Sequence, residues 1–481
     1  MCSRKCEGDG PGHRARSRHP PPTRKFKKPE YRRLRTQSLS FSSPTTTMKF
    51  SHLSTDIIDS ILISLSDFHT LLAAILISKR FHNVFRGRPK SIIRAVAHNI
   101  AGPVLPLALE IARLQDDPDT DDSEAAKDVA DMPPNANVAA MLVANAKVVR
   151  ELEDIFSWRN KDRTSKTSRL TAQESDRFHR ATYRFWLYTI KSRDEDDDDD
   201  DDNDEDEDEE NASRYNQKLL RAYPTPELYE LKRIAAFLSD LLVAMHTTNS
   251  IYDLHITSVS PYLLRQGPAS ILNAYRGHTL TPLVQWHHSI HDFFWNAFGK
   301  VCATRGISEE KWRSEDSQIL DEVIGGSDTC HSCLAVTGLK LWGPTTWELL
   351  HESMSPREMC NFLEGNLPAN PWETMDIISA LRTSHGVTFD YANMLGEMME
   401  LEADSGGVWD KQEWYCMNCV EGLFRTRFRE WWLAKKLRDG APVLENCWYG
   451  YNCRTQQHRQ YHAERLNHLC VPTQGDAPSA N

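Results

Sequence analysis

The sequence lacks any uninterrupted run of about 18 apolar residues, the minimum for a membrane-spanning helix. Its first residues also lack the apolar segment of a secretory signal, so we expect an intracellular protein of the nucleus or cytoplasm, without a membrane partner. No P-loop, dinucleotide-binding glycine motif, G-x-S-x-G motif or kinase motif is present. Nothing in these patterns argues for an enzyme, and we expect a non-catalytic protein.

Alternating apolar and polar residues, the pattern of half-buried strands, are rare, and we find no internal repeat. Apolar residues instead recur at helical spacing in several long segments. These segments are 138–156, 178–188, 228–244 and 283–298. The chain has 481 residues, which allows about three domains. We therefore predict a mostly α-helical fold.

The net charge of −11 is concentrated in separate segments. Residues 1–47 carry 12 Lys and Arg against 3 Asp and Glu, whereas residues 194–210 are acidic at every position except Asn203. A second acidic stretch spans residues 116–131, and the rest of the chain is close to neutral. Repulsion between like charges opposes collapse, so we predict a disordered basic leader and a disordered acidic insertion. The basic clusters of the leader fit a solvated segment or a nuclear localisation signal.

Eight of the 11 cysteines lie after residue 329, and six of these form two CxxC pairs and one C-x5-C pair. Cysteines clustered beside histidines, in a chain without a secretory signal, favour metal-bound thiolates over disulfides. Two CxxC pairs can complete a tetrahedral site of four thiolates. We predict a structural zinc ion held by Cys330, Cys333, Cys416 and Cys419. A redox-active pair and free buried thiols are the alternatives.

The tail of the chain brings two cysteines and two histidines together within a short stretch. Their order and spacing suit a second, closed structural zinc site. The predicted ligands are Cys447, Cys453, His462 and His468. His458 and Cys470 lie nearby, so the spacing leaves the fourth ligand open.

The same stretch contains Tyr449 and Gly450 in a C-x-Y-G-x-x-C pattern, followed by two histidines five residues apart. It resembles the small poly(ADP-ribose)-binding zinc finger. The resemblance implies the same four zinc ligands, and it implies that Tyr449, Tyr451 and Arg454 lie near the adenine of a bound ADP-ribose.

Between the two cysteine-rich segments, residues 423–433 place aromatic side chains at helical spacing, with basic residues between them. We interpret this segment as a helix with a buried aromatic stripe and a solvated basic face. Nucleic-acid binding by the basic face is the alternative.

Near the start of the chain, residues 54–65 carry apolar side chains at helical spacing, and further short helical patterns follow up to Phe85. Three short helices bury little area by themselves, which favours completion of their core by a partner helix. Ile57, Ile61 and Leu65 would supply an apolar face for that partner. The alternative is that these helices simply begin an all-α domain.

The order of residues in this segment resembles the F-box, the helical motif that docks substrate receptors onto a Skp-type adaptor of cullin ubiquitin ligases. The chain as a whole resembles fungal F-box proteins with a cysteine-rich C-terminus, through residues 156–168 and 447–453. The resemblance implies an adaptor and a cullin as partners, together with an unidentified protein substrate. The implied partner-binding residues are Leu53, Ile57, Ile58, Ile61, Leu62, Leu65, Phe68, Leu71, Leu72 and Phe81.

These patterns together predict a mostly α protein with an F-box-like motif, a helical body and a zinc-stapled C-terminal region. The predicted divisions are a basic leader (1–47), the F-box-like motif (48–88), a helical region (89–193), the acidic insertion (194–210), a helical body with the first CxxC pair (211–415), a zinc-binding region (416–470) and a disordered tail (471–481).

The expected function is that of a substrate-recruiting subunit of a Skp-cullin ubiquitin ligase, binding the adaptor through residues 50–88. The alternatives are a zinc-dependent binding module for poly(ADP-ribose) or nucleic acid, and a hydrolase that uses a non-structural zinc ion.

Overall fold

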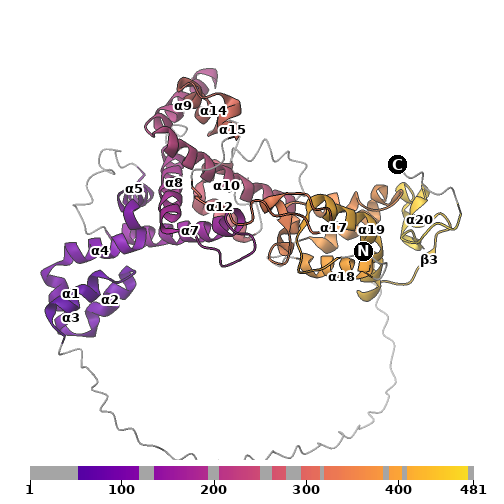
Figure 1. Ribbon diagram of the computed structural model, residues 1–481, viewed down its shortest axis with the longest axis horizontal. Helices are drawn as coiled ribbons and strands as arrows, with labels where there is room; N and C mark the ends of the chain where they lie inside the picture. Colours follow the sequence, from indigo (N-terminus) through magenta and orange to yellow (C-terminus); the bar gives the residue numbers. More distant parts are fainter. Residues whose placement is uncertain are drawn as a thin grey trace, which may run out of the picture. The chain divides into compact units, whose positions relative to one another are not determined.

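The computed structural model describes residues 53–118, 135–192, 205–249, 263–277, 294–314, 319–382, 389–403 and 409–474 (Figure 1). The predicted basic leader and residues 194–204 of the predicted acidic insertion lie outside these ranges. The described part of the chain is mostly helical, as predicted.

Four helices follow one another from Ser54, each short and most of them capped by a polar side chain. Asp67 accepts a hydrogen bond of 2.7 Å from the backbone N–H of Thr70, and Ser54 and Ser78 cap the other two of the first three helices. The helices are α1 (Thr55–Ile63), α2 (Phe68–Ile77), α3 (Lys79–Gly87) and α4 (Pro89–Ala101).

The core of α1–α3 is completed from within the chain. Buried Ile58, Leu62 and Phe81 belong to the same hydrophobic cluster as Ile92 and Val96 of α4. Side chains of α4 thus complete this core from within the chain.

Longer helices form the middle of the chain. They are α5 (Leu105–Asp116), α7 (Ala136–Asn160), α8 (Ala172–Lys191), α9 (Glu205–Arg221), α10 (Thr225–Asn249), α12 (Gly267–Gly277), α14 (Trp295–Thr304) and α15 (Glu309–Ser314), with short 3-10 turns η2 (Gly102–Val104) and η4 (Leu264–Gln266). Helices α7, α8 and α10 confirm three of the predicted helical segments. Most of the fourth, 283–298, lies outside the described residues, and α14 begins only at Trp295.

Helix α9 differs from the sequence prediction at its start. It begins at Glu205, so the last six residues of the predicted disordered insertion, 205–210, are helical.

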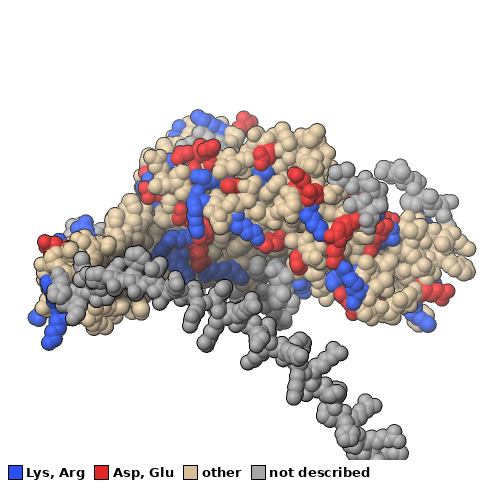
Figure 2. All heavy atoms as spheres, turned by 60° about the horizontal axis from the view of Figure 1, so that its bottom comes forward, with Lys and Arg blue, Asp and Glu red and all other residues tan. Residues whose placement is uncertain are grey.

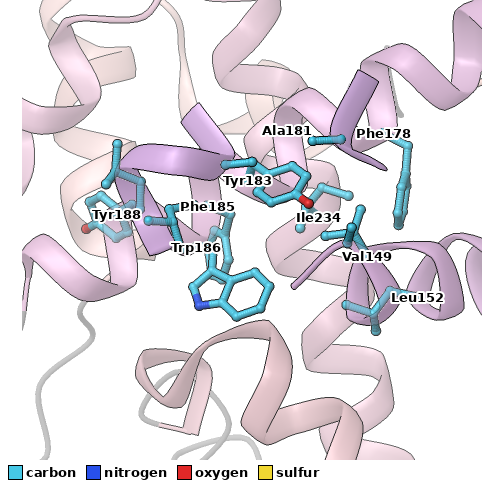
Figure 3. Close-up of a cluster of buried hydrophobic side chains, with 14 of the residues drawn as sticks. Val149, Leu152, Phe178, Ala181, Tyr183, Phe185, Trp186, Tyr188 and Ile234 are labelled. Carbon is cyan, nitrogen blue, oxygen red and sulfur yellow. The ribbon is translucent and has the colours of Figure 1, made fainter. Parts of the chain in front are cut away.

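Aromatic side chains of α7, α8 and α10 form the centre of the helical body. The Phe156 ring lies 5.0 Å from the Phe178 ring and 5.2 Å from the Phe237 ring, measured between centroids. Figure 3 shows Phe178 and Tyr183 of α8 beside Val149 and Leu152 of α7 and Ile234 of α10. This cluster is continuous with the buried side chains of α1–α5.

One helical stretch of the described chain, from Pro89 to Asp116, is long and apolar enough to cross a membrane by length and composition. Half of its most apolar window is buried against other helices, and Gly102 and Pro103 interrupt it between α4 and α5. These are features of core helices.

The C-terminal part contains shorter elements and four two-residue strands. They are η5 (Gly338–Lys340), β1 (Leu341–Trp342), η6 (Trp347–Glu352), α16 (Pro356–Cys360), η7 (Leu367–Ala369), α17 (Pro371–Leu381), α18 (Tyr391–Ala403), β2 (Tyr415–Cys416), α19 (Met417–Arg438), β3 (Glu445–Asn446), η8 (Gly450–Asn452), η9 (Thr455–Gln457), α20 (Gln460–Arg465) and β4 (Leu466–Asn467). Strand β1 pairs antiparallel with β2, and β3 pairs parallel with β4.

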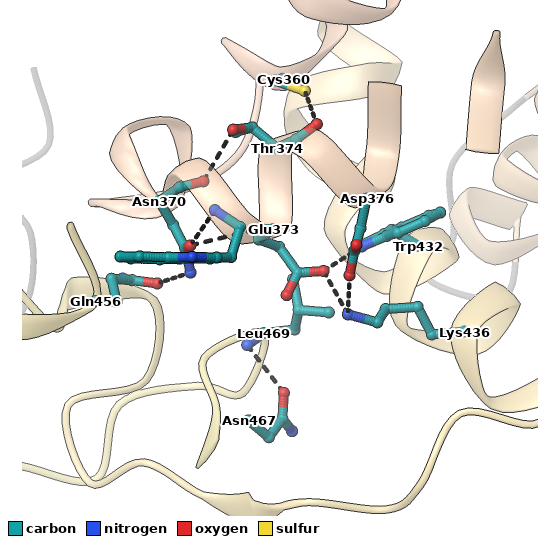
Figure 4. Close-up of polar contacts among 11 residues, drawn as sticks. Cys360, Asn370, Glu373, Thr374, Asp376, Trp432, Lys436, Gln456, Asn467 and Leu469 are labelled. Carbon is teal, nitrogen blue, oxygen red and sulfur yellow. Dashed lines mark hydrogen bonds and ion pairs between the residues drawn. The ribbon is translucent and has the colours of Figure 1, made fainter. Parts of the chain in front are cut away.

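Helix α19 carries the aromatic stripe that the sequence predicts. Its buried side chains include Phe424, Phe428, Trp431 and Trp432, which pack with methionines of α18. The basic residues between them are paired with carboxylates. Figure 4 shows Lys436 and the Trp432 indole both donating to Glu373 of α17, over 2.8 Å and 2.5 Å.

Charge pairing extends over the surface beyond this helix. Figure 2 shows acidic and basic side chains close to one another over much of the face drawn. This mixture agrees with the near-neutral charge that remains once the charged terminal and loop segments are set aside.

The end of α7 and the segment that follows it bury several polar side chains at once. Arg159 forms an ion pair with Glu352 of η6 and also donates to the Tyr275 hydroxyl of α12 over 2.8 Å. Tyr275 donates in turn to Glu352 over 3.1 Å, and Arg233 of α10 donates to the side chain of Asn160. Three elements thus meet at the end of α7.

Two further charged side chains of this segment are also buried. Lys161 pairs with Glu174, whose side chain is fully enclosed at the start of α8. Arg163 donates to Asp328 over 3.0 Å, and its guanidinium lies 4.7 Å from the centre of a Trp414 ring. Burial raises the pKa of Glu174, but hydrogen bonds from Lys161 and from backbone N–H groups outweigh it and lower the pKa to about 2.

The buried Arg159–Glu352 pair predicts that two substitutions in this part of the chain differ strongly in their effect on the free energy of unfolding. Arg159→Met should lower the free energy of unfolding by about 3–5 kcal/mol, because Glu352 keeps a buried charge without its partner. Lys166 pairs with Glu348 of the same 3-10 helix over 2.6 Å, but both side chains are exposed. Lys166→Met should therefore cost at most about 1 kcal/mol. Urea denaturation of the two variants measures both values, and equal losses would contradict the prediction.

Candidate functional sites

The structure brings the two CxxC pairs together. The sulfur atoms of Cys330, Cys333, Cys416 and Cys419 all lie within 4.8 Å of one another. The Cys330 and Cys419 sulfurs are 3.6 Å apart, as are those of Cys333 and Cys416. A tetrahedral ion with metal–sulfur bonds of about 2.3 Å separates its sulfur ligands by about 3.8 Å. The group therefore has the donor set and spacing of a four-thiolate metal centre.

Short backbone elements hold the two pairs in place. Cys330 enters a tight turn that an isolated antiparallel bridge between Thr329 and Val336 closes. Cys416 ends β2, where it stands opposite Leu341 of β1, and Cys419 lies in the first turn of α19. The long separation of the two pairs in sequence is thus bridged by β1 and β2.

The protonation of the thiols favours a bound cation. Burial disfavours a charged thiolate at Cys330, but backbone N–H groups of Cys333 and Cys416 donate to its sulfur and lower its pKa to about 6. Burial raises the pKa of Cys419 to about 12 and also raises that of Cys416. Four adjacent sulfurs cannot all ionise by themselves because like charges repel, and a divalent cation removes that repulsion.

The ligands predicted in the tail also converge. The ligand atoms of Cys447, Cys453, His462 and His468 lie within 4.8 Å of one another. Nε2 of His462 is 3.3 Å from the Cys453 sulfur and 3.8 Å from the Cys447 sulfur. A tetrahedral ion with bonds of about 2.3 Å to sulfur and 2.05 Å to nitrogen separates such atoms by about 3.5 Å. This second group also has the spacing of a tetrahedral centre.

The parallel pairing of β3 with β4 positions the tail ligands. The backbone N–H of Cys447 donates to the Asn467 carbonyl over 3.0 Å, which brings His468 beside it. Gly450 has a φ of 44°, and a Cβ there would lie 2.3 Å from the Cys470 carbonyl oxygen. Only glycine fits this turn, which leads the chain from Cys447 back to Cys453.

His468 is the fourth member of this group. Its side chain is 2% exposed, and neither ring nitrogen has a hydrogen-bond partner within the part of the chain that the structure describes. Burial and the neighbouring His462 lower its pKa to about 4, so the imidazole is neutral, the form that ligates metals. A buried imidazole without a partner is costly unless it binds an ion.

The two alternative ligands lie elsewhere. The Cys470 thiol donates to the backbone carbonyls of Cys447 and Asn467, over 3.3 Å and 3.2 Å, and His458 is exposed. The spacing in the sequence left the fourth member of the tail group open, and the fold places His468 in that position.

The residues that the finger resemblance implies for ADP-ribose are not equally accessible. Tyr449 and Arg454 are exposed, whereas Tyr451 is half-buried with its ring 5.4 Å from the Arg429 guanidinium. We call residues 441–474, which carry this ligand group, the finger. Tyr451 thus attaches the finger to α19.

The ten residues implied for adaptor binding divide between core and surface. Ile57 and Leu72 are exposed. Leu53, Ile61, Leu65 and Phe68 are half-buried and pack against the core, and Ile58, Leu62, Leu71 and Phe81 are fully inside it. The last four hold the helices together. The sequence did not separate them from partner-binding residues, because the spacing of an apolar stripe does not tell a core face from a partner face.

Sequence reasoning missed Leu76 and Ile77, two exposed apolar residues of α2. Leu72, Leu76 and Ile77 are 60%, 76% and 56% exposed, although Leu71 and Ile75 of the same helix are buried. The signal was present, because α2 is apolar on every face, and such a helix is normally covered on every face.

No protein-family model matches this chain, and comparisons with curated proteins and with solved structures return no match.

The convergence of the tail ligands predicts that substituting one of them removes one metal ion from the chain. We expect about two tightly bound metal ions per chain in the wild type and about one in Cys453→Ser. Cys470→Ser is the matched control, because that thiol lies outside both ligand groups, and it should retain both ions. Elemental analysis of the purified chains measures the stoichiometry.

A chelator provides a second measurement on the wild type. Because the tail has few apolar side chains of its own, removal of the metal should make the region after Cys416 sensitive to protease first. A metal-free wild type, or a Cys453→Ser chain with its full metal content, would refute the tail assignment.

Proposed function

We propose that this protein is a non-catalytic substrate-recruiting subunit of a Skp-cullin ubiquitin ligase. Helices α1–α3 would dock the adaptor, and the helical and metal-stapled remainder would bind a protein target. The exposed apolar face of α2 is the observation that carries the proposal.

The face of α2 consists of Leu72, Leu76 and Ile77. Leu72 and Leu76 are at positions i and i+4 and so lie side by side, and Ile77 extends the exposed apolar surface at the end of the helix. Burying one exposed Leu or Ile side chain contributes about 1.5–3 kcal/mol, so three of them can supply much of a docking interaction. Ile57 of α1 adds a further exposed apolar side chain.

The fold supports the proposal in a second way. Because α4 completes the core of α1–α3, the exposed face of α2 does not depend on a partner for folding. An adaptor can therefore bind a preformed surface, without the cost of ordering the motif.

We further propose that both metal ions are zinc and that both are structural. Four thiolates, or two thiolates with two imidazoles, are the usual ligands of structural zinc. Each group supplies four protein ligands, which fill a tetrahedral shell and leave no position for an activated water. X-ray absorption should therefore show sulfur and nitrogen ligands alone. A water ligand would instead favour a hydrolase.

The docking proposal predicts that Leu72→Asp with Leu76→Asp abolishes co-purification with a Skp-type adaptor. A charge forced into an apolar interface costs several kcal/mol, whereas these exposed positions tolerate it in the free protein. Val443→Asp is the matched control, because Val443 is an exposed apolar residue in the C-terminal part. It should bind the adaptor as the wild type does.

Leu65 is less suitable for this test than the sequence suggests, because it packs against the core and its substitution would damage the fold. If the α2 double variant melts at the wild-type temperature and still captures the adaptor at the wild-type level, the docking proposal is wrong.

A further inference from the structure

A surface hollow lies beside the metal centre of the tail. It has a volume of about 640 Å³ and is lined mainly by polar side chains of η9 and α20. Arg459, Tyr461 and Arg465 contribute the largest of these side chains, and Gln460 and Glu445 add hydrogen-bonding groups. His462, a member of the ligand group, also lines it. Pockets of this volume accept ligands of small-molecule size.

The arginines of the hollow differ from those of α19. Arg425, Arg427, Arg429 and Arg438 each form an ion pair with a glutamate. Arg459 and Arg465, by contrast, form no ion pair with any residue that the structure describes, and neither does Arg454 on the same finger. Their positive charge is left for a ligand outside the chain.

Exposed aromatic rings accompany these arginines. Tyr461 is 71% exposed, and Trp448 and Tyr449 of the same finger are 65% and 49% exposed. The Arg465 guanidinium lies 4.9 Å from the centre of the Tyr461 ring and donates to its hydroxyl. This contact fixes the ring and the charge relative to each other while leaving the ring open to solvent.

We propose that this hollow binds a segment of single-stranded nucleic acid. Arg459 and Arg465 would contact backbone phosphates, and Tyr461 would stack on a base. Unpaired arginines beside exposed aromatic rings are the combination that binds single strands, because phosphates need charge and unpaired bases need a flat apolar surface. A duplex conceals the faces of its bases, and a phosphoserine or phosphothreonine residue has no planar group for the ring.

The proposal is independent of the adaptor-docking function. It uses residues 445 and 455–466 alone, whereas docking uses α2. Failure of either leaves the other standing.

The test measures binding of a fluorescein-labelled 15-nucleotide oligouridylate to the full chain by fluorescence anisotropy, between 50 and 200 mM NaCl. Arg459→Ala with Arg465→Ala should weaken binding about tenfold at the lower salt concentration. The slope of log K against log salt should fall in magnitude by about 1.4, since each phosphate contact on a single strand contributes about 0.7. Basic residues outside the hollow are common to both chains, so the difference reports the hollow.

Two control variants test whether any loss of positive charge, or loss of the Tyr461 hydroxyl alone, would weaken binding in the same way. Arg357→Ala removes an exposed arginine outside the hollow and should leave affinity within about twofold of the wild type. Tyr461→Ala should weaken binding about tenfold, the lower end of the range for one lost stack, and Tyr461→Phe should retain affinity. Metal analysis of each variant shows that the finger is intact.

The position of the ligand provides a separate measurement. A 4-thiouridine strand should photocrosslink to Tyr461 or to a neighbouring residue of α20, as mass spectrometry of the peptides would show. Equal affinity of the wild type and the double arginine variant, or crosslinks confined to other segments, would overturn the proposal. Tighter binding of a duplex, a phosphorylated peptide or an ADP-ribose polymer than of the single strand would overturn it as well.

Discussion

The arrangement of the described chain depends on pairing the buried charges at the end of α7 and in the segment just after it. Arg159 and Lys161 are largely removed from water, as are the carboxylates that face them. A buried charge is tolerated only when it is paired and hydrogen-bonded, so Glu352, Tyr275 and Glu174 must all be in place together. One short segment thereby connects α8 and α12 with η6, which also packs beside α10 and α18. Arg163, stacked on Trp414, extends the same connection to the residues just before Cys416.

The two groups of candidate metal ligands lie where the burial of apolar side chains contributes little to stability. The strands beside them are only two residues long, and the finger after residue 440 buries few large apolar side chains. A bound ion would supply the missing stability by joining segments that are distant in sequence. Polar contacts then attach the finger to the rest of the C-terminal part. Figure 4 shows the side chains of Asn370 and Gln456, both buried, joined by a hydrogen bond of 3.0 Å.

The surfaces that remain open are of two chemical kinds. Helix α2 presents an apolar face, and the finger presents unpaired arginines beside exposed aromatic rings. On α19, by contrast, carboxylates face the arginines. The contrast supports both proposals, a protein partner for one surface and a polyanion for the other.

The sequence by itself determined the helices and all but one of the candidate metal ligands. Segments 138–156 and 228–244 are helical because apolar spacing is a local property, and Cys and His spacing indicates the candidate ligands except the fourth of the tail group. Tertiary structure alone decided that His468 rather than Cys470 completes the tail group, and that Ile58 faces the core while Leu76 faces solvent. It also decided that Arg429 is paired and Arg459 is not. Each of these outcomes depends on what a distant segment places beside the residue, and periodicity and spacing carry no information about that neighbour.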